Sequence, residues 1–111
     1  MEKTIDILCA GEILIDCIGQ QTNATLAETT SYARFLGGSP TNVAINAAKL
    51  GLRSALVASC GADGLGDFMI ESLQKANVIT TQLSQKQDTS TSIILVSKST
   101  GTPDFIPYRT A

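Results

Sequence analysis

Residues 37–51 read GGSPTNVAINAAKLG, a glycine pair followed by a helix start and a run of small apolar side chains. Ser39 is a favoured N-cap residue, and Pro40 suits the first helical position, where its missing N–H is not needed. Gly51 stands where such a helix ends with a left-handed residue. The stretch therefore predicts a helix that begins straight after a tight turn and buries one apolar stripe, made of Val43, Ala44, Ala47, Ala48 and Leu50.

The segments on either side predict strands and a second helix. Residues 4–10 are a nearly continuous apolar run, as in a strand buried on both faces of a parallel sheet. Residues 53–60 read as a strand again. Residues 64–77 predict an amphipathic helix that buries Leu65, Phe68, Met69 and Leu73. Strand and helix thus alternate with short connections, which predicts an α/β fold with a parallel sheet.

The remaining extended segments follow a different pattern. Residues 13–18 and 32–36 predict two short strands separated by a polar loop. Residues 91–97 and 104–109 predict two more, joined as a hairpin by a short turn. Two βα units and a few such strands cannot cover both faces of a parallel sheet. We therefore expect an uncovered apolar sheet edge, and a chain that is part of a larger unit.

The composition excludes several classes of protein. With 43% hydrophobic and 16% charged residues, the 111-residue chain is apolar enough to bury a core. Its net charge of −2 argues against an electrostatic binder of nucleic acid or membrane surfaces. No apolar run reaches the roughly 18 residues of a membrane span, and Asp6 and Glu12 make the N-terminal stretch a poor signal peptide. We expect a cytoplasmic protein without nucleic-acid or membrane partners.

The absence of histidine from the sequence excludes Ser-His-Asp and Cys-His catalysis and histidine-containing zinc sites. The three cysteines, Cys9, Cys17 and Cys60, form no C-x-x-C pair and fall in apolar, strand-like stretches, where free thiols behave as small hydrophobic side chains. Any chemistry must therefore use carboxylates, amides, backbone groups or arginine, and we expect no metal site.

Four residues near the glycine pair are candidates for binding a small polar molecule. Asp16 follows an apolar strand, and its carboxylate either accepts hydrogen bonds from two sugar hydroxyls or ends the strand in solvent. Gly37 and Gly38 either form a turn with positive φ or let ligand hydroxyls approach bare backbone. Asn42 lies in the first helical turn, where its amide either bonds the backbone or contacts a ligand.

Two further places carry polar groups of interest. Residues 61–66, GADGLG, lack the Gly-Lys-Ser/Thr ending of a Walker A loop and are not a G-x-G-x-x-G fingerprint. We therefore predict that Asp63 caps the following helix, without nucleotide contacts. Tyr108 and Arg109, on the last predicted strand, either reach a ligand as hydroxyl and cation or stay on the surface.

Four segments occur in the order found in ribokinase-type, or phosphofructokinase-B-type, carbohydrate kinases: residues 11–16 (GEILID), 38–44 (GSPTNVA), 50–51 (LG) and 61–66 (GADGLG). They span most of the chain, which resembles the N-terminal third of that family. The resemblance implies the N-terminal part of a Rossmann-like (ribokinase-like) three-layer α/β/α sandwich with a small β-sheet lid.

The resemblance also implies how this portion of one kinase domain is divided. Core βα units are expected at about 4–11 and 39–77, and lid strands at about 13–18, 32–36 and 91–109. The family's C-terminal catalytic and ATP-binding portion is expected to be absent. Because the lid often serves as a dimer face, the resemblance also allows a homodimer through it.

In that family the residues matching Asp16, Gly38 and Asn42 bind the sugar, and residues matching Tyr108 or Arg109 can touch the substrate in some members. The implied reaction transfers the γ-phosphate of ATP to a sugar hydroxyl, with Mg²⁺ neutralising charge. The catalytic base of the family belongs to a later glycine-rich segment. We therefore expect no catalytic residue in this chain, which alone would be inactive.

The resemblance narrows the substrate to a keto-sugar or keto-sugar acid. Residues 19–21, 28–33 and 36–42 look most like 5-dehydro-2-deoxygluconokinases, whereas residues 105–109 also suit fructokinases and 2-keto-3-deoxygluconate kinases. The alternative is a non-catalytic fragment that binds sugar or pairs two chains. A dinucleotide-binding dehydrogenase domain is disfavoured, because no G-x-G-x-x-G follows the first strand.

Overall fold

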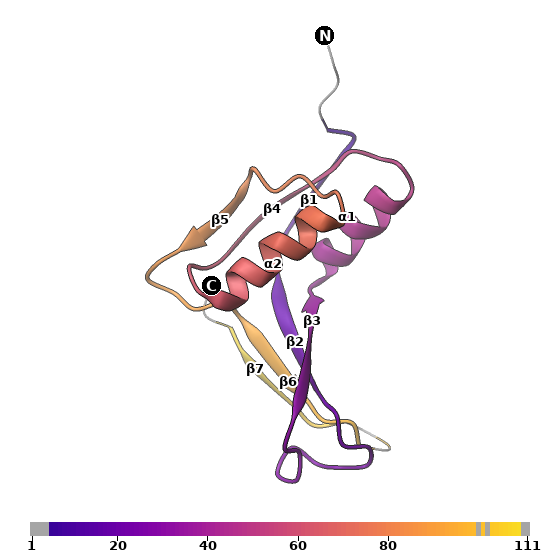
Figure 1. Cartoon of the computed structure of the whole chain (residues 1–111), viewed down its shortest axis with the longest axis vertical. Helices are drawn as coiled ribbons and strands as arrows, with labels where there is room; N and C mark the ends of the chain where they lie inside the picture. Colours follow the sequence, from indigo (N-terminus) through magenta and orange to yellow (C-terminus); the bar gives the residue numbers. More distant parts are fainter. Residues whose placement is uncertain (1–4, 100, 102, 110–111) are drawn as a thin grey trace.

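The computed structural model describes residues 5–99, 101 and 103–109, and shows two β-sheets and two helices in that part of the chain (Figure 1). The elements, in order, are β1 (Ile7–Ala10), β2 (Leu14–Gly19), β3 (Tyr32–Gly37), α1 (Ser39–Lys49), β4 (Ser54–Gly61), α2 (Gly64–Lys75), β5 (Leu83–Lys86), β6 (Ile93–Val96) and β7 (Phe105–Tyr108).

The first sheet has three parallel strands in the order β1-β4-β5. Helix α1 follows β3 and leads into β4, the neighbour of β1 in this sheet, and α2 connects β4 to β5. The parallel sheet agrees with the α/β prediction from the sequence. Strand β5 was not predicted, because its LSQK sequence is polar and largely exposed and gives no apolar signal.

The second sheet has four strands in the order β3-β2-β6-β7 and extends away from the helices as a long arm (Figure 1). Strands β6 and β7 form the predicted hairpin, while β2 pairs antiparallel with β3 and parallel with β6. Asp16 of β2 lies opposite Phe35 and Ile94, so these three residues share one face, called the carboxylate face below.

Both sheets share one hydrophobic core. Ile15 of β2 is fully buried together with Leu56 of β4 and with Met69 and Leu73 of α2. Because side chains alternate along a strand, Ile15 points away from the carboxylate face and into this core. Arg34 is on the same side of its sheet as Ile15, and its guanidinium carbon Cζ lies 3.9 Å from the ring centre of Phe68 in α2. The face opposite Asp16 is therefore the one anchored to the rest of the chain.

The start of α1 differs from the sequence prediction. The N-cap is Gly38, with φ 96° and ψ 137°, and Ser39 is the first helical residue without a capping side-chain bond. The turn requires positive φ at the residue before the helix, which only glycine adopts without strain. The N-cap is therefore Gly38, one residue N-terminal to the predicted Ser39. The end agrees with the prediction, since Gly51 follows the helix with φ 91°.

Two burial predictions were wrong. The buried stripe of α1 is Thr41, Ala44 and Ala47, whereas Val43 is exposed and Leu50 is 81% exposed. Strand β1 is buried on one face only, because Leu8 is 58% exposed. The exposed side chain of Leu8 leaves apolar surface uncovered on that face of β1. No helix among the described residues is long and apolar enough to cross a membrane.

Candidate functional site

The antiparallel pairing of β2 and β3 brings Asp16 to the start of α1. Gly37, the last residue of β3, lies opposite Leu14 and next to Asp16. A Cβ atom at Gly37 would lie 2.6 Å from Oδ2 of Asp16 and 2.5 Å from Cδ1 of Leu14. The carboxylate thus lies directly over bare backbone, and a side chain at position 37 would have to displace the Asp16 carboxylate and the Leu14 methyl group.

Gly38 packs against the turn between β1 and β2. A Cβ atom there would overlap the carbonyl oxygen of Glu12 and lie 3.2 Å from Cα of Ile13. The close approach of these two turns fixes the first turn of α1 relative to the strand that carries Asp16. Both glycines therefore have a structural role, and the carboxylate and the helix N-terminus lie together because of it.

Asn42 lies exposed in the first turn of α1. Its backbone N–H donates to the carbonyl of Gly38 at 3.3 Å. Within the described residues, neither the Asn42 amide nor the Asp16 carboxylate makes a side-chain hydrogen bond or ion pair. Two groups that can bond hydroxyls are therefore left without protein partners at one end of α1.

The surroundings of Asp16 make its charge costly. The residue is half-buried, and burial raises the pKa of its carboxyl above the ordinary value. No hydrogen bond or cation in the described part of the chain offsets that cost. A ligand that donates hydrogen bonds to the carboxylate would offset this cost of burying the charge. A carboxylate in solvent has no such cost, because water already donates hydrogen bonds to it.

A pocket of about 470 Å³ continues along the carboxylate face. Ile18 and Phe35 line it and lie on the same side of the sheet as Asp16, and Lys98 brings a cation to it. Its size suits a small molecule.

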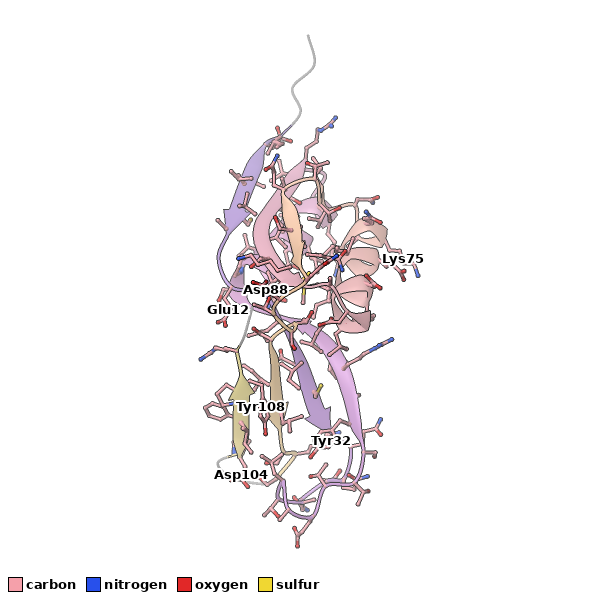
Figure 2. All side chains as sticks on the ribbon, turned by 90° about the vertical axis from the view of Figure 1, so that its left-hand side faces the viewer. Glu12, Tyr32, Lys75, Asp88, Asp104 and Tyr108 are labelled. Atoms are coloured by element: carbon pink, nitrogen blue, oxygen red, sulfur yellow. The ribbon has the colours of Figure 1, made fainter. Side chains whose placement is uncertain are left out.

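The structure separates the two C-terminal candidates. Tyr108 lies opposite Ile93 in the β6–β7 ladder, which places it on the face away from Asp16, and it is 50% exposed. Arg109 turns toward the β1–β2 turn, where its Nε lies 3.0 Å from Oε2 of Glu12. In Figure 2 Glu12 lies at the level where the two sheets meet, and Tyr108 lies below it on β7. Of these two residues, Arg109 therefore contacts the β1–β2 turn, against which Gly38 packs.

Asp63 is the N-cap of α2, as predicted, but it does more than cap. Its Oδ1 accepts hydrogen bonds from Gly66 N–H at 2.8 Å and from the Thr91 hydroxyl at 2.7 Å, and its Oδ2 accepts one from Thr91 N–H at 2.9 Å. Burial raises the pKa of Asp63, but these hydrogen bonds and one from Leu65 outweigh burial and hold it below the ordinary value. The carboxylate is fully engaged and is not a free base. Sequence reasoning missed Thr91, because nothing local links two residues 28 positions apart.

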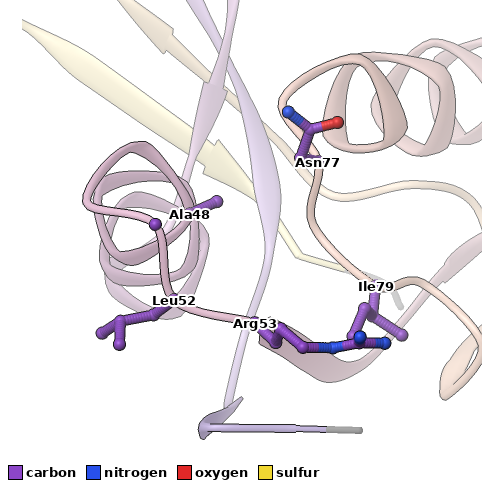
Figure 3. Close-up of a pocket in the computed structure, with 6 residues that line it drawn as sticks. Ala48, Leu52, Arg53, Asn77 and Ile79 are labelled. Atoms are coloured by element: carbon purple, nitrogen blue, oxygen red, sulfur yellow. The ribbon is translucent and has the colours of Figure 1, made fainter.

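Two further observations limit the site. Among the residues that the structure describes, no three histidine, cysteine or acidic side chains gather in a way that could hold a metal ion. A second pocket, of about 300 Å³, lies where α1 and α2 end, far from Gly38 along α1 (Figure 3). Helix C-termini carry partial negative charge, so this pocket is no counterpart to the site at the start of α1. It is lined by Ala48, Gly51, Leu52, Arg53, Asn77 and Ile79.

Comparison with known proteins extends this description. The family model for pfkB family carbohydrate kinases matches residues 4–111. An ATP-dependent 6-phosphofructokinase of Thermoanaerobacterium thermosaccharolyticum is 41% identical over 110 residues, which are 99% of this chain and 34% of that protein. A 5-dehydro-2-deoxygluconokinase of Bacillus subtilis is 37% identical over 87 residues, which are 78% of this chain and 27% of that protein.

Solved structures show the same arrangement. The fructokinase of Halothermothrix orenii has a TM-score of 0.89 and 40% identity, over 96% of this chain and 38% of that one. The sugar kinase PH1459 of Pyrococcus horikoshii, solved in complex with ATP, has a TM-score of 0.87 and 33% identity, over 92% of this chain and 33% of that one. The predicted fold class is therefore confirmed. The chain spans about a third of the length of the curated relatives that it matches.

Proposed function

The chain belongs to the pfkB family of carbohydrate kinases, and from that premise we propose that it forms the sugar-binding part of an enzyme that phosphorylates a keto-sugar or keto-sugar acid with ATP. The family assignment agrees with the resemblance found in the sequence. Members of this family are phosphotransferases. The substrate, the site residues and the activity of the whole protein are the content of the proposal.

One observation supports the proposal most strongly: the carboxylate of Asp16 lies over the bare backbone of Gly37, and no described residue bonds or pairs with it. In the proposal it accepts hydrogen bonds from two hydroxyls of the sugar, each of which contributes about 1.5–3 kcal/mol when the acceptor is charged. Asn42 adds an amide that donates and accepts, and Gly38 allows the sugar to approach the start of α1.

The four-stranded sheet acts as a lid in this proposal. It carries Asp16 on the carboxylate face and projects from the core, so closing it over a bound sugar would exclude water (Figure 1). Exclusion of water matters to a kinase, because ATP would otherwise be hydrolysed instead of transferring its phosphate to the sugar.

The reaction chemistry is assigned mostly outside this chain. In the proposal the sugar hydroxyl attacks the γ-phosphorus of ATP after losing its proton to a base, and no residue described here is assigned that role. Asp63 is unsuited to it, since both of its oxygens accept hydrogen bonds. The described residues also offer no cluster for Mg²⁺, which would reach the site with the phosphates of ATP.

The substrate class rests on the names of the relatives. Two of them are named for fructose or its phosphate and one for 5-dehydro-2-deoxygluconate, all of which are keto compounds with several hydroxyls. The pocket along the carboxylate face, with Lys98 in its lining, can hold the far end of such a molecule, whether neutral or anionic.

Calorimetric titration tests the proposal. D-fructose, fructose 6-phosphate and 5-dehydro-2-deoxygluconate are titrated into the chain, into Asp16→Asn and into Asp104→Asn. Asp104 is an exposed acid near the start of β7, so its variant is a control for the loss of one charge. We expect one keto compound to bind the chain and the control equally and Asp16→Asn at least tenfold more weakly. Equal binding to all three proteins would refute the role of Asp16.

A second candidate is a module that pairs two chains through the lid. The observation in its favour is the set of large apolar side chains exposed on the four-stranded sheet, Phe35, Phe105, Ile106 and Tyr108. Phe105, the most exposed of them at 64%, is the residue to change. If the lid pairs two chains, sedimentation velocity will show a dimer that Phe105→Ser dissociates; a monomer at all concentrations would eliminate this candidate.

A further inference from the structure

The connection between β5 and β6, residues 87–92, is where the two sheets are joined. Figure 1 shows β6 starting beside the first turn of α2, and Figure 2 places Asp88 of this connection at the level where the sheets meet. The end of the connection is buried, since Thr91 is 5% exposed and Ser92 is fully buried. Whatever holds this connection sets the position of the four-stranded sheet against the core.

Asp63 holds it by hydrogen bonds to both the backbone and the side chain of Thr91. Thr91 N–H donates to Oδ2 of Asp63 at 2.9 Å, and the Thr91 hydroxyl donates to Oδ1 at 2.7 Å. That hydroxyl also accepts a hydrogen bond from Gly61 N–H at 3.0 Å. Thr91 is therefore bonded to the end of β4 and to the cap of α2 at once.

Gly61 permits this contact. A Cβ atom at Gly61 would lie 2.5 Å from the nitrogen of Thr91 and 2.8 Å from the carbonyl carbon of Ser90. The connection thus lies directly on the backbone of Gly61. A helix cap alone requires neither a glycine at this position nor a threonine 28 residues away, because the bond from Gly66 N–H already satisfies the cap.

Thr91 is connected to the strand of Asp16 through its neighbour Ser92. The carbonyl of Ser92 accepts a hydrogen bond from Ile15 N–H at 2.9 Å, and Asp16 is the next residue of β2. The β2–β6 ladder then continues from Ile15 opposite Ile93. A shift of Thr91 would therefore be passed to Asp16 through backbone hydrogen bonds between buried residues.

We propose that Asp63 is a positioning residue that ties the four-stranded sheet to the core through Thr91 and thereby fixes Asp16 over the start of α1. The tie itself is independent of what the protein binds. Its effect on ligand affinity rests on the proposed function.

Two variants separate the tie from the cap. Asp63→Asn keeps an oxygen for Gly66 N–H, and asparagine caps helices as well as aspartate does, but its NH₂ group cannot accept the bond from Thr91 N–H. Thr91→Val removes the hydroxyl at nearly constant volume and leaves the cap untouched. Asp67→Asn is the matched control, because Asp67 is an acid of the same helix that accepts a bond from Gln85 at 2.9 Å outside the tie.

Amide hydrogen exchange of the chain is the first measurement. We expect Asp63→Asn and Thr91→Val to speed the exchange of Ile15 N–H by about tenfold, which corresponds to about 1.4 kcal/mol, while Met69 in α2 keeps its protection. Asp67→Asn should change neither, and Thr91→Ser, which restores the hydroxyl, should recover the slow exchange of Ile15. Unchanged exchange at Ile15, or equal loss at Ile15 and Met69, would overturn the tie.

The second measurement is the affinity for the keto compound that binds the unmodified chain. Weaker binding by Asp63→Asn and Thr91→Val, with Asp67→Asn unaffected, would support the positioning of Asp16. Unchanged affinity in both would overturn that part of the proposal. If no keto compound binds even the unmodified chain, the proposed function fails, while the exchange of Ile15 still decides whether the tie exists.

Discussion

Replacing Gly38 by alanine should destabilise the fold, because both its backbone conformation and its surroundings exclude a Cβ atom. The residue has φ 96°, and an added Cβ atom would overlap the carbonyl oxygen of Glu12. A left-handed backbone costs an alanine roughly 1–2 kcal/mol. Overlap with a rigid backbone atom adds about 1–3 kcal/mol, as overpacking does elsewhere. The lower entropy of the unfolded alanine chain returns about 0.4–1 kcal/mol. The net loss is therefore about 1–4.5 kcal/mol.

Two other glycines supply the controls. Gly51 also has positive φ, at 91°, but nothing lies within 4 Å of its added Cβ atom, so Gly51→Ala isolates the backbone cost at roughly 1 kcal/mol net. Gly64, the first residue of α2, has open space around it and no positive φ, so Gly64→Ala should be neutral or stabilising by up to about 1 kcal/mol.

Urea denaturation followed by far-ultraviolet circular dichroism measures the free energy of unfolding of the three variants. The slopes must stay equal for the midpoints to be compared directly. The order of stability should be Gly64→Ala, then Gly51→Ala, then Gly38→Ala. If Gly38→Ala were as stable as Gly51→Ala, the contact between Gly38 and the Glu12 carbonyl would not hold the site as described.

Three further predictions concern charged groups. Burial raises the pKa of Asp16, so the folded chain is most stable below the unfolded pKa, where the carboxyl is neutral, and loses stability as pH rises through the folded pKa. Asp16→Asn, which cannot ionise, should therefore raise the melting temperature at pH 7 but not at pH 3. Hydrogen bonds outweigh burial and hold the pKa of Asp63 low. The stability that the charged carboxylate contributes is therefore present above the unfolded pKa of about 3.9 and lost as pH falls through the folded pKa. Between pH 5 and pH 2 the melting temperature should fall more steeply for the unmodified chain than for Asp63→Asn. Arg109→Gln breaks an exposed ion pair and should change the free energy of unfolding in urea by less than about 1 kcal/mol, with the difference vanishing at 1 M salt.

The parts of the fold that follow from local sequence could be predicted. The helix after the glycine pair, the cap at Asp63 and the β6–β7 hairpin each have a signal within a few residues. Strand β5 could not be predicted, because it is held by backbone pairing with β4 and carries polar side chains. The exposure of Leu8 likewise depends on what covers the sheet, which no local pattern contains.

The site divides in the same way. Residues near the glycine pair could be proposed from sequence, because the β3–α1 turn itself places Gly37, Gly38 and Asn42 together, and pairing of two short strands adds Asp16. The contact from Asp63 to Thr91 could not, since it depends on how the connection from β5 crosses the end of β4. Tyr108 was a candidate because of its position on the last strand. The face of the sheet on which it lies depends on the pairing register of β6 and β7, and a shift of one residue would place it on the other face.

The central claim is that a sugar binds at the start of α1 under Asp16, and amide chemical-shift mapping tests it most directly. The ¹⁵N-labelled chain is titrated with the keto compound that calorimetry selects. The account predicts saturable shifts centred on the amides of Asp16, Gly37, Gly38 and Asn42, and their loss in Asp16→Asn. Shifts centred instead on Leu52, Asn77 and Ile79 around the pocket at the helix ends, or shifts that persist in Asp16→Asn, would contradict it.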